Sequence, residues 1–312
     1  MLLKCLLTIL ITLNKILNMF SIVIPLYNKD YRVIKTLNSI INQTYLGPFE
    51  IIIVNDGSSD GSLEIVKEYF KNKSDIDYTI IDQVNQGVSV ARNNGIEKAK
   101  YNWICLLDAD DELINNALSI YYKLIQDFSK VYFFCGGFTI NGKLRETNLD
   151  SGYVKDFFLE SRKFSFVNTS CTCIKKDLLL KFPFPEGEKA GEDLYVWARI
   201  AENFQIVYTR EIVADRFHEE DNSRSGRDNV IPYILKYYSE NKTRNKSLIS
   251  YLKYVYFVHL ADVASKLRYA AWYNRWKIGL KLFPGFSIFS IPFTFLPIGL
   301  LRKIKIKKNE KA

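Results

Sequence analysis

Three aspartates stand close together in the segment LDADDE, which follows a short apolar run. The carboxylates of Asp108, Asp110 and Asp111 repel one another at this spacing, and a hard divalent cation is the usual way to offset that repulsion. Mg²⁺ or Mn²⁺ that bridges phosphate oxygens needs only one or two protein carboxylates, because substrate and water supply the other ligands. The motif therefore predicts a cation site for a phosphorylated substrate; a solvated acidic turn that caps the next helix is the alternative.

Three further carboxylates, at two places in the sequence, occupy positions where they could do chemistry. Asp56 lies in the turn NDGSSDGS after an apolar run, where a carboxylate can accept from a nucleobase imide or a ribose hydroxyl. Capping of the next helix is the structural alternative for Asp56. Glu192 and Asp193 open an expected helix, where the helix dipole favours negative charge. Asp193 could therefore be either a helix cap or a general base for an incoming hydroxyl group.

The elements that would position these residues alternate from Phe20 onward. Continuous apolar runs predict strands at Phe20–Leu26, Phe49–Asn55, Tyr78–Gln83 and Trp103–Asp108. Helical patterns follow the first three at about 31–43, 61–71 and 88–100. This alternation predicts an α/β fold with a mostly parallel sheet that is covered on both faces. Ligands of such sheets bind at the carboxyl ends of the strands, and polar residues end each of these four runs.

The alternation stops after Asp111. Asn141-Gly142 is a hairpin signal, Phe164–Ile174 is expected as a strand and Gly191–Phe204 as a helix. This half of the chain is interpreted as α+β material that completes a substrate site.

Five motifs, in this order, resemble family 2 glycosyltransferases, which have the GT-A fold. They are SIVIPLYN, NDGSSDGS, NQGVSVARNNGI, LDADD and GEDLYVWAR, within about Phe20 to Ser225. The resemblance implies an inverting transfer of a sugar from a nucleotide-diphosphate donor, UDP by default, with Mn²⁺ or Mg²⁺ as cofactor. The acceptor would be a hydroxyl of a saccharide or lipid-linked saccharide in cell-surface polysaccharide synthesis. A non-catalytic sugar-binding or scaffolding protein that keeps the fold is the alternative, although the DxD and ED carboxylates are all present.

The resemblance also assigns roles to single residues. Asp193 would be the catalytic base, and Asp110 the direct metal ligand, with Asp108 as a second ligand closer to the ribose. His218, in RFHEEDNSRS, could reach the metal or the diphosphate, or be an ordinary core or surface histidine. The nucleotide-sugar site would be formed by Pro25, Tyr27, Asp56, Gly87, Arg92 and Asp108.

Other enzyme classes lack the residues that they would need. A Rossmann dehydrogenase requires GxGxxG after its first strand, and a sugar-phosphate nucleotidyltransferase requires a glycine-rich basic loop there; SIVIPLYNKD provides neither. An aspartyl phosphatase carries its DxD at the first strand, whereas here it ends the fourth. A glycoside hydrolase has no need of a metal-binding DxD.

Composition indicates a globular body with a basic C-terminal region. The 312 residues are 48% hydrophobic and 25% charged, enough to bury a full core without disulfides or structural metal. Of the 43 basic residues, 16 lie between Lys236 and Ala312, against only 3 acidic ones there. The five cysteines form no CxxC pair, which excludes the usual zinc spacings and favours buried free thiols in a cytoplasmic protein. The expected domains are 1–19, an apolar extension; 20–225, the GT-A domain; and 226–312, a helical C-terminal region.

The two ends of the chain carry apolar segments. In residues 1–19 the longest uncharged run, Cys5–Asn14, is too short to span a bilayer, and the segment is interpreted either as a membrane-leaning helix or as a start codon assigned too early. Leu282–Leu301 has no charge for 20 residues but holds three prolines, and RKIKIKK follows it. This pattern predicts peripheral attachment to an anionic membrane surface, at the inner face of the cell membrane. A buried helical hairpin with a solvated basic tail is the alternative; nucleic-acid binding is not expected, because no reading motif is present.

Overall fold

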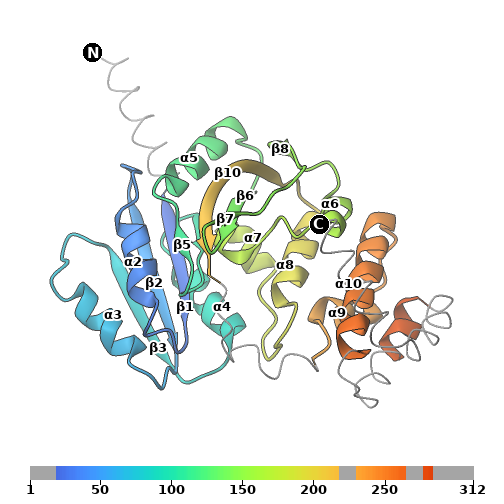
Figure 1. The fold of residues 1–312 in the computed structure, drawn as a ribbon, viewed down its shortest axis with the longest axis horizontal. Coiled ribbons are helices and arrows are strands. Elements are labelled where there is room, and N and C mark those ends of the chain that lie inside the picture. The colour runs from blue at the N-terminus through green and yellow to red at the C-terminus, as the bar shows by residue number, and fades with distance from the viewer. Residues whose placement is uncertain (1–18, 218–229, 265–276, 284–312) are drawn as a thin grey trace. The chain divides into compact units, whose positions relative to one another are not determined.

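The computed structural model describes residues 19–217, 230–264 and 277–283 (Figure 1). The chain forms two compact units, and 156–165 and 188–198 group with 220–312 in the second of them. The expected domain boundaries stay a prediction. The apolar N-terminal extension, His218, nearly all of the apolar segment 282–301 and the basic tail lie outside the described residues.

The first unit is built on a mixed sheet with the order β3-β2-β1-β4-β9-β6-β10-β5. Its four neighbouring strands β3, β2, β1 and β4 are all parallel, as the sequence predicts. β9 runs antiparallel to β4 and β6, and β10 pairs in parallel with β6. The strands are β1 (Phe20–Leu26), β2 (Phe49–Asp56), β3 (Tyr78–Gln83), β4 (Trp103–Leu106), β5 (Glu112–Leu113), β6 (Phe133–Ile140), β7 (Lys143–Leu144), β8 (Gly152–Tyr153), β9 (Thr172–Lys175) and β10 (Val207–Arg216).

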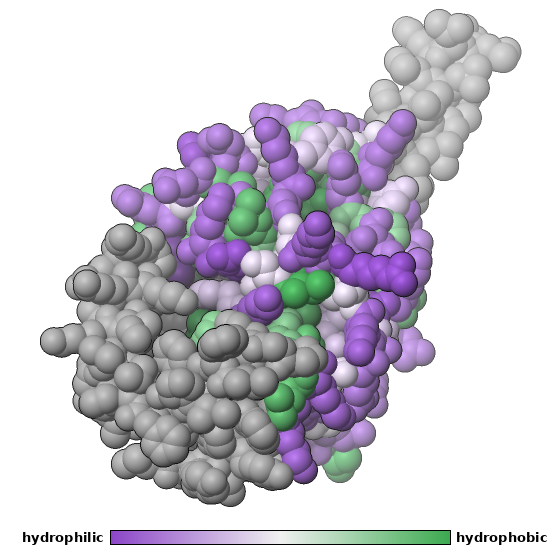
Figure 2. All heavy atoms as spheres, turned by 90° about the vertical axis from the view of Figure 1, so that its right-hand side faces the viewer, coloured by the Kyte–Doolittle hydropathy of each residue, from purple (hydrophilic) through white to green (hydrophobic). Residues whose placement is uncertain are grey.

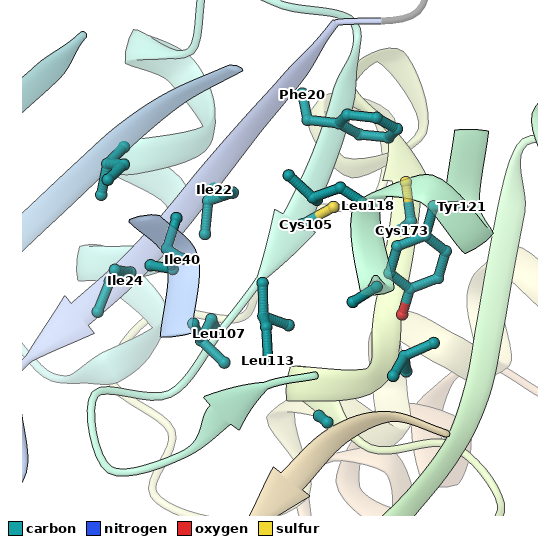
Figure 3. Close-up of a cluster of buried hydrophobic side chains, with 14 of the residues drawn as sticks. Phe20, Ile22, Ile24, Ile40, Cys105, Leu107, Leu113, Leu118, Tyr121 and Cys173 are labelled. Atoms are coloured by element: carbon teal, nitrogen blue, oxygen red, sulfur yellow. The ribbon is translucent and has the colours of Figure 1, made fainter. Parts of the chain in front are cut away.

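Helices cover both faces of the parallel strands. Alternate residues of β1 point to opposite faces, so Phe20, Ile22 and Ile24 pack into one core with α2 and α5 (Figure 3). Val23 faces α4 on the other side, where a side chain at Gly95 would collide with a methyl group of Val23. Glycine therefore lets α4 approach the sheet closely. The helices of this unit are α2 (Val33–Ile41), α3 (Ser62–Phe70), α4 (Val88–Lys98), α5 (Ala117–Asp127) and α7 (Lys176–Lys181).

The α+β half differs from expectation in one strand. Of the expected strand Phe164–Ile174, only the end is β9, because a short 3₁₀ helix occupies Thr169–Cys171. The side chain of Asn168 accepts from the N–H of Ser170 and so starts that helical turn. The Asn141-Gly142 hairpin between β6 and β7 is confirmed, since both residues have positive φ.

Four of the five cysteines are buried and free in the described residues, as expected. Cys105 and Cys173 face each other across the β4–β9 pair and belong to the core drawn in Figure 3. Burial raises the pKa of the Cys173 thiol, so it stays protonated and acts as a small apolar side chain.

The second unit is helical. α6 (Phe157–Lys163) packs on α10 (Lys246–Ala264), which also contacts α9 (Tyr233–Glu240), and α8 (Glu192–Ala201) begins in this unit. Asp156 caps α6 by accepting from the N–H of Leu159 at 2.9 Å.

Within the described ranges, no helix is both long and apolar enough to cross a membrane. The face shown in Figure 2 is mostly hydrophilic where it is coloured, with apolar side chains in small areas.

Candidate active site

Loops that follow β1 and β2 fix each other at the carboxyl edge of the sheet. The backbone of Asn28 has a φ of 52°. Its side-chain oxygen accepts from the backbone N–H of Ser59 at 2.8 Å, and its backbone N–H donates to the Ser58 hydroxyl. The N–H of Lys29 donates to the Ser62 hydroxyl at 2.7 Å. The glycine- and serine-rich turn thus holds the end of SIVIPLYNK in place.

Asp56 holds the loop after β3. It is 2% exposed; its Oδ1 accepts from Gln83 and from the N–H of Gln86, and its Oδ2 accepts from the N–H of Gly87, each at 2.8 Å. Three of about four acceptor positions of the carboxylate are therefore used within the chain. The helix-capping alternative for Asp56 is wrong, because the carboxylate accepts from the end of β3 and the loop after it and not from the start of α3. There Asp60 accepts from the N–H of Ser62.

The aspartates of LDADDE have three different environments. Asp108 keeps 30% of its side chain exposed and accepts from Arg92 at 2.9 Å. Asp110 keeps 26% exposed and pairs with the Lys29 ammonium at 2.7 Å. Asp111 is 3% exposed and accepts from the Ser170 hydroxyl and, at 2.9 Å, from the N–H of Phe217.

Asp111 differs from Asp108 and Asp110 in its burial, which changes its pKa. Burial raises its pKa to about 7, the charge of Asp108 adds to the rise, and the hydrogen bonds from Ser170 and Phe217 oppose it. Asp111 therefore ties β10 to the loop after β4, and Asp108 and Asp110 are left as the accessible carboxylates.

These two carboxylates fit a hard divalent cation. In the parts of the chain that the structure describes, no group of three or more His, Cys, Asp or Glu side chains could hold a metal alone. Mg²⁺ and Mn²⁺ accept one or two carboxylates and take the remaining oxygen ligands from phosphate and water. The donor set of Asp108 and Asp110 thus suits a cation that binds together with a phosphorylated ligand.

The predicted nucleotide residues fall into two groups. Tyr27 is 49% exposed at the end of β1, and Gly87 lies before α4 with φ 93°. Pro25 lies within β1 opposite Val54, and Arg92 is 4% exposed and turned toward Asp108. Tyr27 and Gly87 are therefore exposed or half-exposed, whereas Arg92 is positioned to orient a carboxylate.

Asp193 lies in the second unit, in the first turn of α8. Gly191 has φ 71°, and a side chain there would meet Pro232 at 2.8 Å, so glycine is needed at this helix start. The Asp193 charge, after burial itself, raises the pKa of the Tyr251 hydroxyl. The side chain of Asp193 accepts from the N–H of Leu194 at 2.7 Å, so its helix-capping alternative stays open.

Sequence reasoning missed Lys29 and Ser170. Lys29 carried a signal, since it is a basic residue directly after a strand that ends at the same edge as three aspartates. Ser170 carried none, because its bond to Asp111 spans 59 positions of the chain. His218 lies outside the described residues.

The sequence and the fold of this chain are similar to those of known glycosyltransferases. The family model "Glycosyl transferase family 2" matches residues 21–182. "Uncharacterized glycosyltransferase YibD" of Escherichia coli is 46% identical over 98 residues, which are 31% of this chain and 27% of that protein. The "GalNAc(5)-diNAcBac-PP-undecaprenol beta-1,3-glucosyltransferase" of Campylobacter jejuni is 27% identical over 66% of this chain and 67% of its own length. "Minor teichoic acid biosynthesis protein GgaB" of Bacillus subtilis is 35% identical over 56% of this chain and 20% of its own length.

The chain spans between 15% and 30% of the length of five curated relatives that it matches, the E. coli and B. subtilis proteins among them. Among solved structures, S. aureus TarS 1–349 in complex with UDP-GlcNAc matches with a TM-score of 0.57 and 19% identity, over 84% of this chain and 87% of that one. The mannosyltransferase PcManGT from Pyrobaculum calidifontis, in complex with GDP-Man and Mn²⁺, matches with a TM-score of 0.60 and 14% identity, over 94% and 84%. At these identities the structures establish a shared fold.

Proposed function

The chain belongs to glycosyl transferase family 2 and has its α/β GT-A fold, and from this premise we propose that it transfers a sugar from a nucleotide-diphosphate donor to a hydroxyl group. The partly exposed carboxylates of Asp108 and Asp110, beyond the end of β4, are the observation that carries the proposal. Accessible carboxylates at this edge suit a cation bound with a diphosphate.

The donor would bind along the carboxyl ends of β1 to β4. Tyr27 offers an exposed ring to a nucleobase, and Asp56 keeps one acceptor position for an imide N–H. Gly87 and Pro25 would shape the pocket, and Arg92 would contribute by holding Asp108. We take UDP as the nucleotide of the donor, which the complex of TarS with UDP-GlcNAc supports. The sugar that this chain transfers would be a hexose or an N-acetylhexosamine.

The reaction would be a single displacement with inversion. Asp193 takes the proton of the acceptor hydroxyl as that oxygen attacks the anomeric carbon, and the diphosphate leaves from the opposite face. Asp110 and Asp108 would hold Mn²⁺ or Mg²⁺, which when bound neutralises charge on the leaving diphosphate. No protein nucleophile takes part.

We place the reaction in cell-surface polysaccharide synthesis, on a saccharide or lipid-linked saccharide acceptor. Two relatives support this class, one named for teichoic acid biosynthesis and one for an undecaprenol-linked acceptor. The apolar segment 282–301 and the basic residues after it support attachment at the inner face of the cell membrane.

A panel of UDP- and GDP-linked hexoses and N-acetylhexosamines tests the function. Full-length protein should hydrolyse one donor slowly with Mn²⁺ and not in EDTA, since water can replace the acceptor. A donor that binds without turnover, with and without added saccharide, would favour the non-catalytic alternative. Binding of no nucleotide sugar would overturn the proposal.

A further inference from the structure

The side chain of Lys29 pairs with the partly exposed carboxylate of Asp110. Its ammonium lies 2.7 Å from Oδ2 of Asp110 and donates to the Tyr31 hydroxyl at 3.2 Å, and its side chain keeps 15% exposure. The backbone of Lys29 is fixed, because its N–H donates to Ser62 and its carbonyl accepts from the N–H of Val33 at the start of α2. Only the four-carbon stem is left to move.

This ion pair conflicts with a divalent cation on the same carboxylate. A cation on Asp110 would lie within a few ångströms of the ammonium, and the two like charges would repel each other. Lys29 must then leave Asp110 or weaken the binding of the cation.

Arg92 does not face the same conflict. The residue is 4% exposed, and its guanidinium donates to Asp108 and lies 5.1 Å from the centre of the Phe184 ring. A buried, planar group held on two sides stays in place, whereas a partly exposed ammonium on a flexible stem can turn to a new acceptor.

We infer that Lys29 exchanges partners: it neutralises Asp110 when the site is empty, and it binds a diphosphate oxygen of the nucleotide when the cation takes Asp110. This inference rests on the proposed function, since it requires a nucleoside diphosphate at the edge of the sheet. The exchange links the cation to the nucleotide, because the nucleotide gives the displaced ammonium a new acceptor.

Two binding measurements on the full-length chain test the exchange. Mn²⁺ binding without nucleotide is followed by the electron paramagnetic resonance of free Mn²⁺, and binding of UDP, GDP and uridine by calorimetry. Lys29→Met removes the charge with a similar stem, and Lys29→Arg keeps it. Lys71→Met is the matched control, because Lys71 is exposed and its ion pair is with Glu68, which is also exposed, at the C-terminal end of α3.

Lys29→Met should bind Mn²⁺ alone about fivefold more tightly and nucleoside diphosphate in Mn²⁺ about tenfold more weakly. Uridine binding should not change, Lys29→Arg should keep diphosphate binding, and Lys71→Met should match the wild type. Unchanged Mn²⁺ affinity in Lys29→Met, or unchanged diphosphate affinity, overturns the exchange. A wild type that binds Mn²⁺ but neither UDP nor GDP overturns the proposed function itself, and so the two failures can be told apart.

Discussion

Arg92 donates a 2.9 Å hydrogen bond to Oδ1 of Asp108, from a side chain that is only 5% exposed to a carboxylate that is 30% exposed. The family resemblance assigns Arg92 to the nucleotide, and that contact stays a prediction, but this bond gives the arginine a second role. It fixes the direction of a carboxylate that the proposed reaction needs.

We therefore expect Arg92→Met to lower kcat/KM at least about tenfold, because Asp108 loses its fixed orientation. The free energy of unfolding should fall by about 1–3 kcal/mol, the usual cost of losing a hydrogen bond to a charged group. Arg92→Lys should recover only part of the activity, since an ammonium lacks the planar fork. Steady-state kinetics and urea denaturation measure the two effects; wild-type kinetics in Arg92→Met would remove Arg92 from the site.

Asp110→Asn tests the cation. Transfer should be lost while the fold is kept, because the Asp110 side chain is partly exposed and its pair with Lys29 contributes about 0–1 kcal/mol. Wild-type activity should vanish in EDTA and return with Mn²⁺ or Mg²⁺. Asp127→Asn, at the exposed end of α5, removes the same charge and should be active. Full turnover in chelator would contradict the cation assignment.

Asp111 predicts a pH dependence of stability. Its pKa in the folded chain is raised to about 7 from 3.8, so the folded state keeps a proton that the unfolded state loses between these values. Its contribution is fully present below pH 3.8 and is lost as pH rises through 7, at up to about 1.4 kcal/mol per pH unit. Asp111→Asn has no such proton, so its stability relative to the wild type should increase from pH 5 to pH 8. Urea denaturation in EDTA at four pH values measures this difference, and a constant difference would refute the raised pKa.

The parallel half of the fold follows from the sequence because three of its four strands, β1, β2 and β4, are apolar runs buried on both faces, and the edge strand β3 is partly buried. Periodicity gave those strands and the polar residues at their ends, and the carboxyl-edge rule brought Asp56 and Asp108 to one edge. The 3₁₀ turn at Thr169–Cys171 was missed, because Phe164–Ile174 was interpreted as one strand and Asn168 was not recognised as a capping residue within it.

Pairings between distant residues could not be predicted either. Lys29 meets Asp110 and Ser170 meets Asp111 only after the sheet has formed, and no local pattern encodes such contacts. The presence of acidic residues at this edge of the sheet was therefore predictable from the sequence, whereas the side chains that orient and neutralise them were not.

Asp193→Asn tests the base. We expect kcat to fall by about 10²–10⁴, the usual contribution of general acid–base catalysis, with little change in nucleotide affinity. Glu240→Gln, an exposed residue at the end of α9, is the control in the same unit and should keep full activity. If Asp193→Asn instead loses nucleotide binding while turnover at saturation survives, Asp193 is a donor ligand.

Residues 282–312, almost wholly outside the described residues, combine an apolar segment with a basic tail. Six basic residues and one acidic residue between Arg302 and Ala312 follow 20 uncharged positions. Each Lys or Arg near an anionic lipid surface contributes about 1 kcal/mol, which salt weakens, whereas burial of apolar side chains in lipid does not depend on salt in this way.

Full-length protein should therefore pellet with anionic vesicles. Salt should release only part of it, and detergent or deletion from Lys281 onward should release all of it. Replacing Lys303, Lys305, Lys307 and Lys308 by glutamine should remove the salt-sensitive part alone, because the apolar segment is kept. A full-length chain that stays in solution at low salt and does not bind anionic vesicles would contradict membrane attachment and favour a buried hairpin with a solvated basic tail.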